Sequence, residues 1–264
     1  MARRNSGGRR HAHRVAGEPA YVLHHYDWSE SSLILDLFTR HHGRVVVVAK
    51  GAKRPYSQLR PVLLPFQRLL VSYSSRDEDG AEVHTLKAAD WAGGLPMPTG
   101  AALLTGFYLN ELLMKLLARS DAHPRLFDHY AATLPALAGA EDVGVQAALR
   151  AFELALLRGI GVLPELHTET LTQLPVQDEV RYGLDAEAGV HALAPGEVGL
   201  RGAWLREAQR ALALSDGPHG LAAVQQACRL ALPELKSVLR GLLHYHLGTP
   251  MLRTRQLLME LQQP

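Results

Sequence analysis

Apolar residues follow two different periodicities along the chain, and the change lies near Pro96. Before it, short runs of alternating or β-branched apolar residues are separated by turn residues, a pattern typical of strands. The predicted strands are Tyr21–His25, Leu33–Thr39, Arg44–Lys50, Leu69–Ser74 and Ala81–Ala88. Five short strands in so short a stretch favour a small closed barrel, either of the OB type or SH3-like.

After Thr99 the apolar residues recur every three or four positions, which predicts helices. Thr99 is suited to cap the first helix, and Pro135 is expected to kink the second or to end it early. The later predicted helices are Pro124–Ala138, Val145 to Gly159 or Gly161, Leu205–Leu214, Leu221–Leu230, Pro233–Leu247 and Leu252–Leu261. Between Pro164 and Pro195 the helical pattern breaks, and alternation with turn residues predicts a β-hairpin.

These patterns divide the chain into a basic tail that we expect to be disordered (1–17), a barrel domain (18–95) and a helical domain (96–264) with a β-hairpin insert (164–197). The first 14 residues contain five arginines and lack the apolar core of a secretory signal. The single cysteine, Cys228, excludes an internal disulfide and fits a reducing cytoplasm. No apolar run approaches the roughly 20 residues that cross a bilayer, so we expect no membrane partner.

Positive charge is concentrated in one segment. Residues 40–68 contain seven Lys or Arg and no Asp or Glu, whereas the whole chain has a formal net charge of only +2. These cations either solvate a turn or form a surface that binds the phosphates of a nucleic acid. In the second interpretation Tyr56 is the better stacking candidate, because Phe66 follows an apolar run and Pro65. The nucleic-acid-binding candidates are Arg40, Arg44, Lys50, Lys53, Arg54, Tyr56 and Arg60.

Catalytic signatures are missing from the sequence. There is no GxxxxGK[ST], GxSxG, HExxH or GxGxxG motif. Cys228 lies in an apolar helical pattern and fits a buried small hydrophobe better than a nucleophile. The chain has 14 histidines, but adjacent ones such as His24 and His25 point to opposite faces of a strand and cannot chelate by themselves. We therefore expect no enzyme activity, no catalytic residue, no metal and no cofactor.

Several short motifs follow one another over most of the chain, from about Val22 to Leu261. They are Leu37-Phe38-Thr39, Gly43-Arg44-Val45, Val48-Ala49-Lys50-Gly51-Ala52, Leu64-Pro65-Phe66, Tyr108-Leu109-Asn110-Glu111-Leu112-Leu113, His123-Pro124, Leu149-Arg150-Ala151-Phe152-Glu153-Leu154 and His246-Leu247-Gly248. In this order and spacing they resemble RecO, a family of bacterial recombination mediators. The resemblance favours an OB-type barrel over the SH3-like alternative.

The resemblance implies a DNA-binding protein that acts in DNA repair and recombination. It implies binding to single- and double-stranded DNA, and annealing of complementary strands coated with the single-stranded DNA-binding protein SSB. It also implies that the protein, together with RecR, helps to load RecA. It places the protein in the cytoplasm, associated with the nucleoid. It also implies that the helical domain binds the acidic and aromatic C-terminal tail of SSB. Arg150 matches a motif arginine and is our candidate for that role, unless it pairs with Glu153.

The sequence departs from the family in the insert. Many RecO proteins resemble a zinc ribbon there, with four cysteines, whereas this insert contains none and offers only His167 and His191. A structural zinc needs about four ligands, so we expect apolar packing to hold the hairpin. Two other function classes stay open: an OB-fold factor that binds structured RNA, and an adaptor whose basic loop binds an acidic protein. Lys236, Arg240 and His244 form a stripe that is either a solvated face or, with Arg253 and Arg255, an extended cationic surface.

Overall fold

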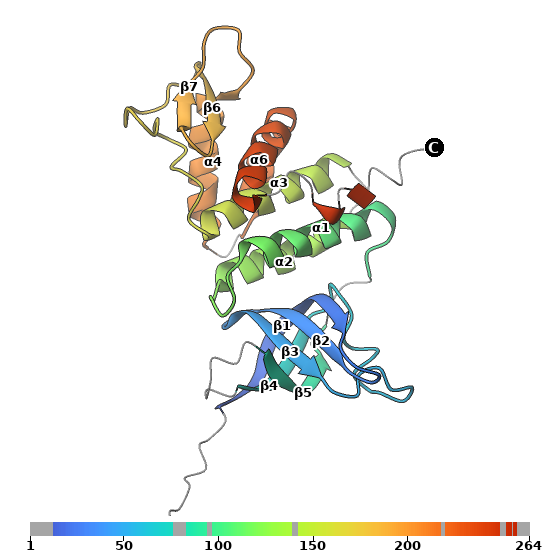
Figure 1. Cartoon of the computed structure of the whole chain (residues 1–264). Coiled ribbons are helices and arrows are strands. Elements are labelled where there is room, and N and C mark those ends of the chain that lie inside the picture. Colours follow the sequence, from blue (N-terminus) through green and yellow to red (C-terminus); the bar gives the residue numbers. More distant parts are fainter. Residues whose placement is uncertain are drawn as a thin grey trace, which may run out of the picture. The chain divides into compact units, whose positions relative to one another are not determined.

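The structure is a computed structural model that describes residues 13–75, 83–93, 97–138, 142–217, 220–248, 252–254 and 256–257. The chain divides into two compact units (Figure 1). The first comprises Met1–Thr39 and Val45–Gly93, and the second comprises Arg40–Arg44 and Gly94–Pro264.

The first unit is built on a closed barrel with the strand order β1-β2-β3-β5-β4 (Figure 1). Its strands are β1 (His13–Asp27), β2 (Leu33–Thr39), β3 (Gly43–Ala49), β4 (Leu69–Ser75) and β5 (Val83–Trp91). β1 pairs with both β2 and β4, and β3 pairs with β5 in parallel, which closes the sheet on itself. The predicted OB-type barrel is thus confirmed. Its core is formed by inward residues from alternate positions, such as Leu35 and Leu37 on β2 and Val45 and Val47 on β3.

β1 begins earlier than the sequence pattern indicates. Residues 13–17, which we assigned to the disordered tail, belong to this strand, and Val15 packs in the barrel core opposite Tyr73. The pairing shifts between Val15 and Glu18, where Gly17 has a φ of 65° that favours glycine. The prediction failed here because the predicted tail is rich in arginine, and of residues 14–17 only Val15 packs in the core. The rest of the predicted tail, residues 1–12, lies outside the described residues.

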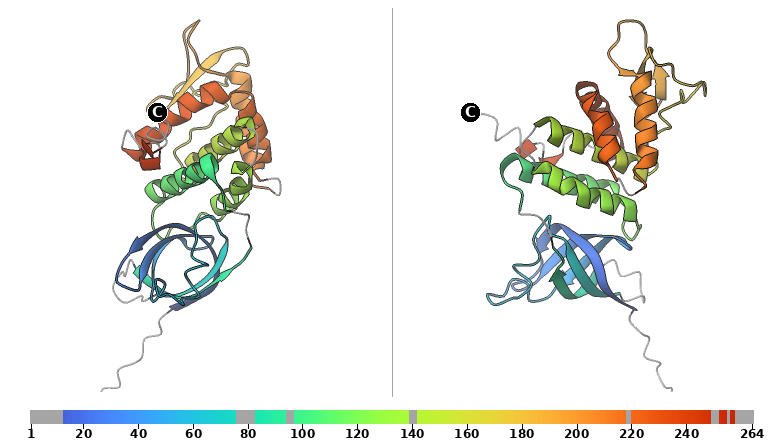
Figure 2. Two further views of the ribbon diagram at one scale, coloured as in Figure 1. Left: turned by 90° about the vertical axis from the view of Figure 1, so that its right-hand side faces the viewer. Right: turned by 180° about the vertical axis from the view of Figure 1, so that it is seen from behind.

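The second unit contains helices and a small antiparallel sheet (Figure 2). The strand order of this sheet is β7-β6-β8. Its helices are α1 (Gly100–Leu116), α2 (Pro124–Leu137), α3 (Asp142–Gly159), α4 (Gly202–Leu214), α5 (Ala222–Arg229) and α6 (Leu232–Leu247). Its strands are β6 (Arg181–Asp185), β7 (Gly189–Ala192) and β8 (Leu200–Arg201). The central helix is α3, which packs against α2, α5 and α6 and is buried at every position from Ala147 to Leu157.

The insert forms the predicted hairpin from β6 and β7, and β8 adds a third strand that the sequence pattern did not indicate. Tyr182, Leu184 and Val190 are buried, so apolar side chains hold this sheet together. Pro135 lies in the last turn of α2, which ends two residues later at Leu137. Thr99 takes the N-cap position of α1 with an extended backbone but makes no capping hydrogen bond through its side chain. Among the described residues, no helix combines the length and apolar character needed to cross a membrane.

Candidate nucleic-acid interface and partner groove

The predicted basic segment follows β3 as an irregular loop, residues 50–60, which we name the basic loop. Successive turns shape it: the Arg54 N–H donates to the Gly51 carbonyl at 3.2 Å and the Ser57 N–H to the Arg54 carbonyl at 3.0 Å. Gly51 has a φ of 73°, a conformation that other residues rarely adopt. Ala52 anchors the loop because it packs in the barrel core. The loop therefore has a defined base from which its polar side chains point into solvent.

The side chains of the basic loop are available to a ligand. Lys50, Arg54 and Arg60 are exposed, and Tyr56 is 95% exposed. Lys53 is half-buried, and its Nζ lies 3.4 Å from the Asp27 Oδ1 atom. Within the residues that the structure describes, the side chains of Lys50, Arg54 and Arg60 have no hydrogen-bond or ion-pair partner. Unpaired cations on an exposed loop are suited to bind phosphate.

The sequence pattern did not indicate which segment lies next to this loop. The Lys53 N–H donates to the Ser31 carbonyl at 3.0 Å, so the basic loop is joined to the turn between β1 and β2. Tyr26 at the end of β1 and Trp28 in that turn are 49% and 64% exposed. The signal was present in the sequence as two aromatic residues next to a Ser- and Glu-rich turn. The first unit thus combines cationic and aromatic side chains on two connected loops.

Arg40 and Arg44 belong to the second unit and are already bonded within it. The Arg40 guanidinium donates to both carboxylate oxygens of Asp128, at 3.0 and 2.9 Å. The Arg44 guanidinium donates to the Leu117 carbonyl at 3.0 Å and to the Met114 carbonyl. A phosphate would have to compete with these bonds. Their role in DNA binding stays a prediction.

Arg150, the predicted contact for a partner peptide, lies inside the second unit. It is 8% exposed, and its Nη1 donates to the Glu153 Oε2 at 2.6 Å. The other carboxylate oxygen of Glu153 accepts a hydrogen bond of 2.7 Å from the Tyr108 hydroxyl. Burial raises the pKa of Glu153, and the neighbouring Arg150 charge and Tyr108 hydroxyl counteract that rise. This arrangement is the alternative that the sequence left open, an arginine paired with Glu153.

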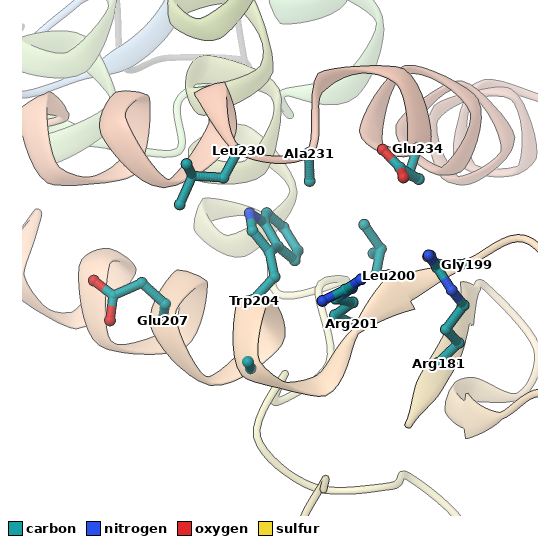
Figure 3. A pocket seen from close by; sticks show the side chains of 10 residues that line it. Arg181, Gly199, Leu200, Arg201, Trp204, Glu207, Leu230, Ala231 and Glu234 are labelled. Atoms are coloured by element: carbon teal, nitrogen blue, oxygen red, sulfur yellow. The ribbon is translucent and has the colours of Figure 1, made fainter. Parts of the chain in front are cut away.

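An accessible arginine next to apolar residues lies elsewhere in the second unit. A cavity of about 490 Å³ opens between β8, the start of α4 and the junction of α5 with α6. Figure 3 shows the Trp204 ring in its middle, with Leu230 on one side and Leu200 and Arg201 on the other. Trp204 is fixed by a hydrogen bond of 2.8 Å from its Nε1 to the Ala227 carbonyl. We name this cavity the Trp204 groove.

The rim of the Trp204 groove has one exposed apolar side chain and several charged ones. Leu230 is 74% exposed and forms one apolar wall of the groove. Within the described part of the chain, the side chains of Arg201 and Glu234 have no hydrogen-bond or ion-pair partner. Glu207 is paired with Arg210 at 2.5 Å, and Arg181 donates to the Gly199 carbonyl at 2.6 Å. An apolar slot with a free guanidinium at its edge is suited to a peptide that has an apolar side chain beside a carboxylate.

The described residues contain no cluster of three or more His, Cys, Asp or Glu side chains that could hold a metal ion. The insert itself has no cysteine, so it has no cysteine-based zinc site. His167 and His191 lie near single carboxylates instead, at 3.5 Å from Glu165 and 3.6 Å from Asp185.

Both units match known protein families. Residues 15–94 match the model described as "Recombination protein O N terminal", and residues 97–256 match "Recombination protein O C terminal". The chain belongs to the RecO family. It is 54% identical over 250 residues to the DNA repair protein RecO of Polaromonas naphthalenivorans, covering 94% of this chain and 98% of that protein. It is 53% identical over 252 residues to the DNA repair protein RecO of Verminephrobacter eiseniae, covering 95% and 98%.

The RecO resemblance seen in the sequence motifs is therefore confirmed over almost the whole chain. Membership of this family supports a role in DNA repair and recombination. The OB-type barrel of the first unit fits that role, because such barrels bind oligonucleotides on a strand face and its loops.

Proposed function

We propose that this RecO family member is a non-catalytic mediator that binds single- and double-stranded DNA and anneals complementary strands coated with SSB. In this proposal it acts with RecR and helps RecA to replace SSB. The observation that carries the proposal is the basic loop of the barrel, whose Lys50, Arg54 and Arg60 are exposed and unpaired within the described residues. Family membership in a group of DNA repair proteins supports the same conclusion.

Annealing requires no chemical step. Two complementary strands repel each other through their phosphates, and a protein that places cations on both lowers that repulsion. Binding through phosphates depends little on base sequence and weakens steeply as salt concentration rises. An exposed basic surface with few base-edge contacts is therefore sufficient for the activity.

The second part of the proposal concerns SSB, whose acidic and aromatic tail would bring the protein to coated strands. Arg150 is a poor first contact, because a tail carboxylate would have to displace Glu153 and leave that buried carboxylate without its charged partner. The Trp204 groove offers Arg201 for a carboxylate and an apolar slot for an aromatic ring without such a cost. We therefore place the tail in the Trp204 groove and keep Arg150 as the competing site.

The test is annealing of complementary single strands, either naked or coated with SSB, with the SSB tail present or deleted. The proposal expects the protein to anneal both substrates, and annealing of the coated strands to require the tail. A variant with Lys50, Lys53 and Arg54 all changed to Ala should anneal poorly on either substrate. Folded protein that anneals nothing at low salt would contradict the mediator role, and selective binding to RNA would support the RNA-binding alternative.

A further inference from the structure

The end of β1 has no buried face. Residues 24–30, which include the end of this strand and the turn after it, are all exposed, whereas barrel strands normally bury alternate side chains. We name residues 24–32 the β1 arm. It holds Tyr26, which is 49% exposed, and Trp28, which is 64% exposed. The two are two residues apart in sequence, and the Tyr26 ring also contacts the His24 ring edge-on, with centroids 4.5 Å apart. Several exposed aromatic rings on one segment indicate a surface that a partner covers.

The β1 arm and the basic loop are held together by one residue. The main-chain N–H of Lys53 donates to the Ser31 carbonyl at 3.0 Å, and its Nζ lies 3.4 Å from Asp27 Oδ1. Tyr56 follows three residues later in the same loop and is 95% exposed. The exposed rings of the first unit therefore include three on two connected segments: Tyr26, Trp28 and Tyr56.

Charge on these two segments selects the kind of partner. The basic loop holds four Lys or Arg and the β1 arm two acids, so the pair has an excess of two positive charges. Asp27, one of the acids, forms an ion pair with Lys53. Lys50, Arg54 and Arg60 stay unpaired within the described residues and favour a polyanion. Exposed rings beside free cations fit a ligand that offers both phosphates and open base faces.

We propose that Tyr26 and Trp28 form a stacking platform for unpaired DNA bases, and that the platform gives the protein a preference for single strands over duplex. This inference rests on the proposed DNA-binding function and assigns its strand selectivity to the β1 arm. A single strand can stack a base on an aromatic ring while its phosphates meet the basic loop. In a duplex the base faces are covered by their neighbours, so only the phosphate contacts are left.

The test compares Trp28→Ala with the unchanged full chain in binding to a 20-nucleotide dT strand and to a 20-base-pair duplex at one salt concentration. We expect the Kd for the single strand to rise about tenfold, a loss within the range for one stacked base, and the Kd for the duplex to change less than about twofold. Trp91→Ala is the matched control, because Trp91 is also exposed, at 62%, but donates to Gln67 and lies on β5. It should leave both affinities unchanged.

A second measurement does not depend on the stability of an alanine variant. In a Trp91→Phe background, Trp28 is the one exposed tryptophan left, since Trp204 is only 7% exposed. The dT strand should quench its fluorescence strongly, and the duplex should not. Absence of quenching by a dT strand that binds would overturn the platform.

The possible failures are separable. Equal effects of Trp28→Ala on single strand and duplex, or no effect on either, would overturn the stacking platform while leaving DNA binding by the basic loop intact. If the unchanged protein bound neither DNA, the proposed function itself would fail.

Discussion

The carboxylate of Glu111 binds Thr254, which is 143 residues away along the chain. Its Oε2 atom accepts hydrogen bonds from the Thr254 N–H at 3.0 Å and from the Thr254 hydroxyl at 2.8 Å, and its Oε1 atom accepts one from the Arg253 N–H at 2.9 Å. Lys115 lies 3.4 Å from the same carboxylate. Glu111 thus fixes the short helical segment after α6 to α1.

This contact predicts a stability that depends on pH. Burial alone would raise the pKa of Glu111, but the hydrogen bonds from Thr254 and Arg253 and the nearby Lys115 charge lower it below its usual range. A carboxyl whose pKa is lowered in the folded state stabilises the fold above its ordinary pKa, and this stabilisation is lost as the pH falls through the lowered value. Glu111→Ala should reduce the free energy of unfolding by about 2 kcal/mol at pH 7. Urea unfolding of both proteins at pH 7 and at pH 3 measures this difference in the free energy of unfolding. The difference should be smaller at pH 3.

The ion pair of Arg150 with Glu153 makes a prediction that separates structure from partner binding. Arg150→Ala leaves a fully buried carboxylate without its charged partner, so we expect a loss of about 3–5 kcal/mol in stability. Replacing both residues, as in Arg150→Met with Glu153→Leu, should restore much of that loss because no lone buried charge is left. Thermal unfolding of the single and double variants checks this. A stable Arg150→Ala protein that has lost only its SSB binding would contradict the structural role.

The barrel and the helices could be predicted well from the sequence because their signals are local. The four consecutive valines of β3 are typical of a strand, and the three- and four-residue spacing of apolar positions in α1 is typical of a helix. The partners of individual charges could not be predicted in the same way. Arg40 meets Asp128 and Glu111 meets Thr254 only because the fold brings distant segments together.

Local patterns also misled where one residue decides the structure. Val15 packs in the barrel core, so the start of β1 belongs to the barrel although the neighbouring residues are rich in arginine. Trp28 was overlooked because its exposure is a property of the turn and not of the residue type. The role of Arg150 was ambiguous for a similar reason, since spacing allowed a pair with Glu153 without requiring one.

The single cysteine provides a probe of the second unit. Cys228 is fully buried, and burial, together with the nearby Glu153 charge, raises the pKa of its thiol to about 12. A thiolate is the reactive form, so a thiol reagent at pH 8 should modify the folded protein far more slowly than the urea-unfolded protein. Arg150→Ala should speed the reaction, because opening of the destabilised unit becomes more frequent. Rapid labelling of the native, unchanged protein would contradict the buried position.

The basic loop predicts a salt-dependent effect on DNA affinity. Changing Lys50, Arg54 and Arg60 to Ala should weaken binding to single strands of different sequence about equally, because phosphate contacts carry no base information. The slope of log affinity against log salt should become shallower by about 2 for single strands, since each lost phosphate contact contributes about 0.7. Lys236→Ala with Arg240→Ala, two exposed positions on α6, is the control for removing charge elsewhere. An equal change in slope for the control would mean that the affinity comes from overall charge or from the α6 stripe, and not from the loop in particular.

The Trp204 groove gives the sharpest prediction about SSB. A peptide with the sequence of the SSB tail should bind the full chain, and Arg201→Ala should weaken that binding about tenfold because a charge-assisted contact to its carboxylate is lost. Leu230→Ser should have a similar effect by removing one wall of the apolar slot. Since Arg201 and Leu230 are both exposed, neither change should lower the thermal stability appreciably, in contrast to Arg150→Ala. Titration of a labelled peptide followed by fluorescence anisotropy measures the Kd.

A different result would move the tail site to α3. That result is an unchanged peptide affinity in both groove variants, together with a loss of peptide affinity in a folded Arg150→Met variant.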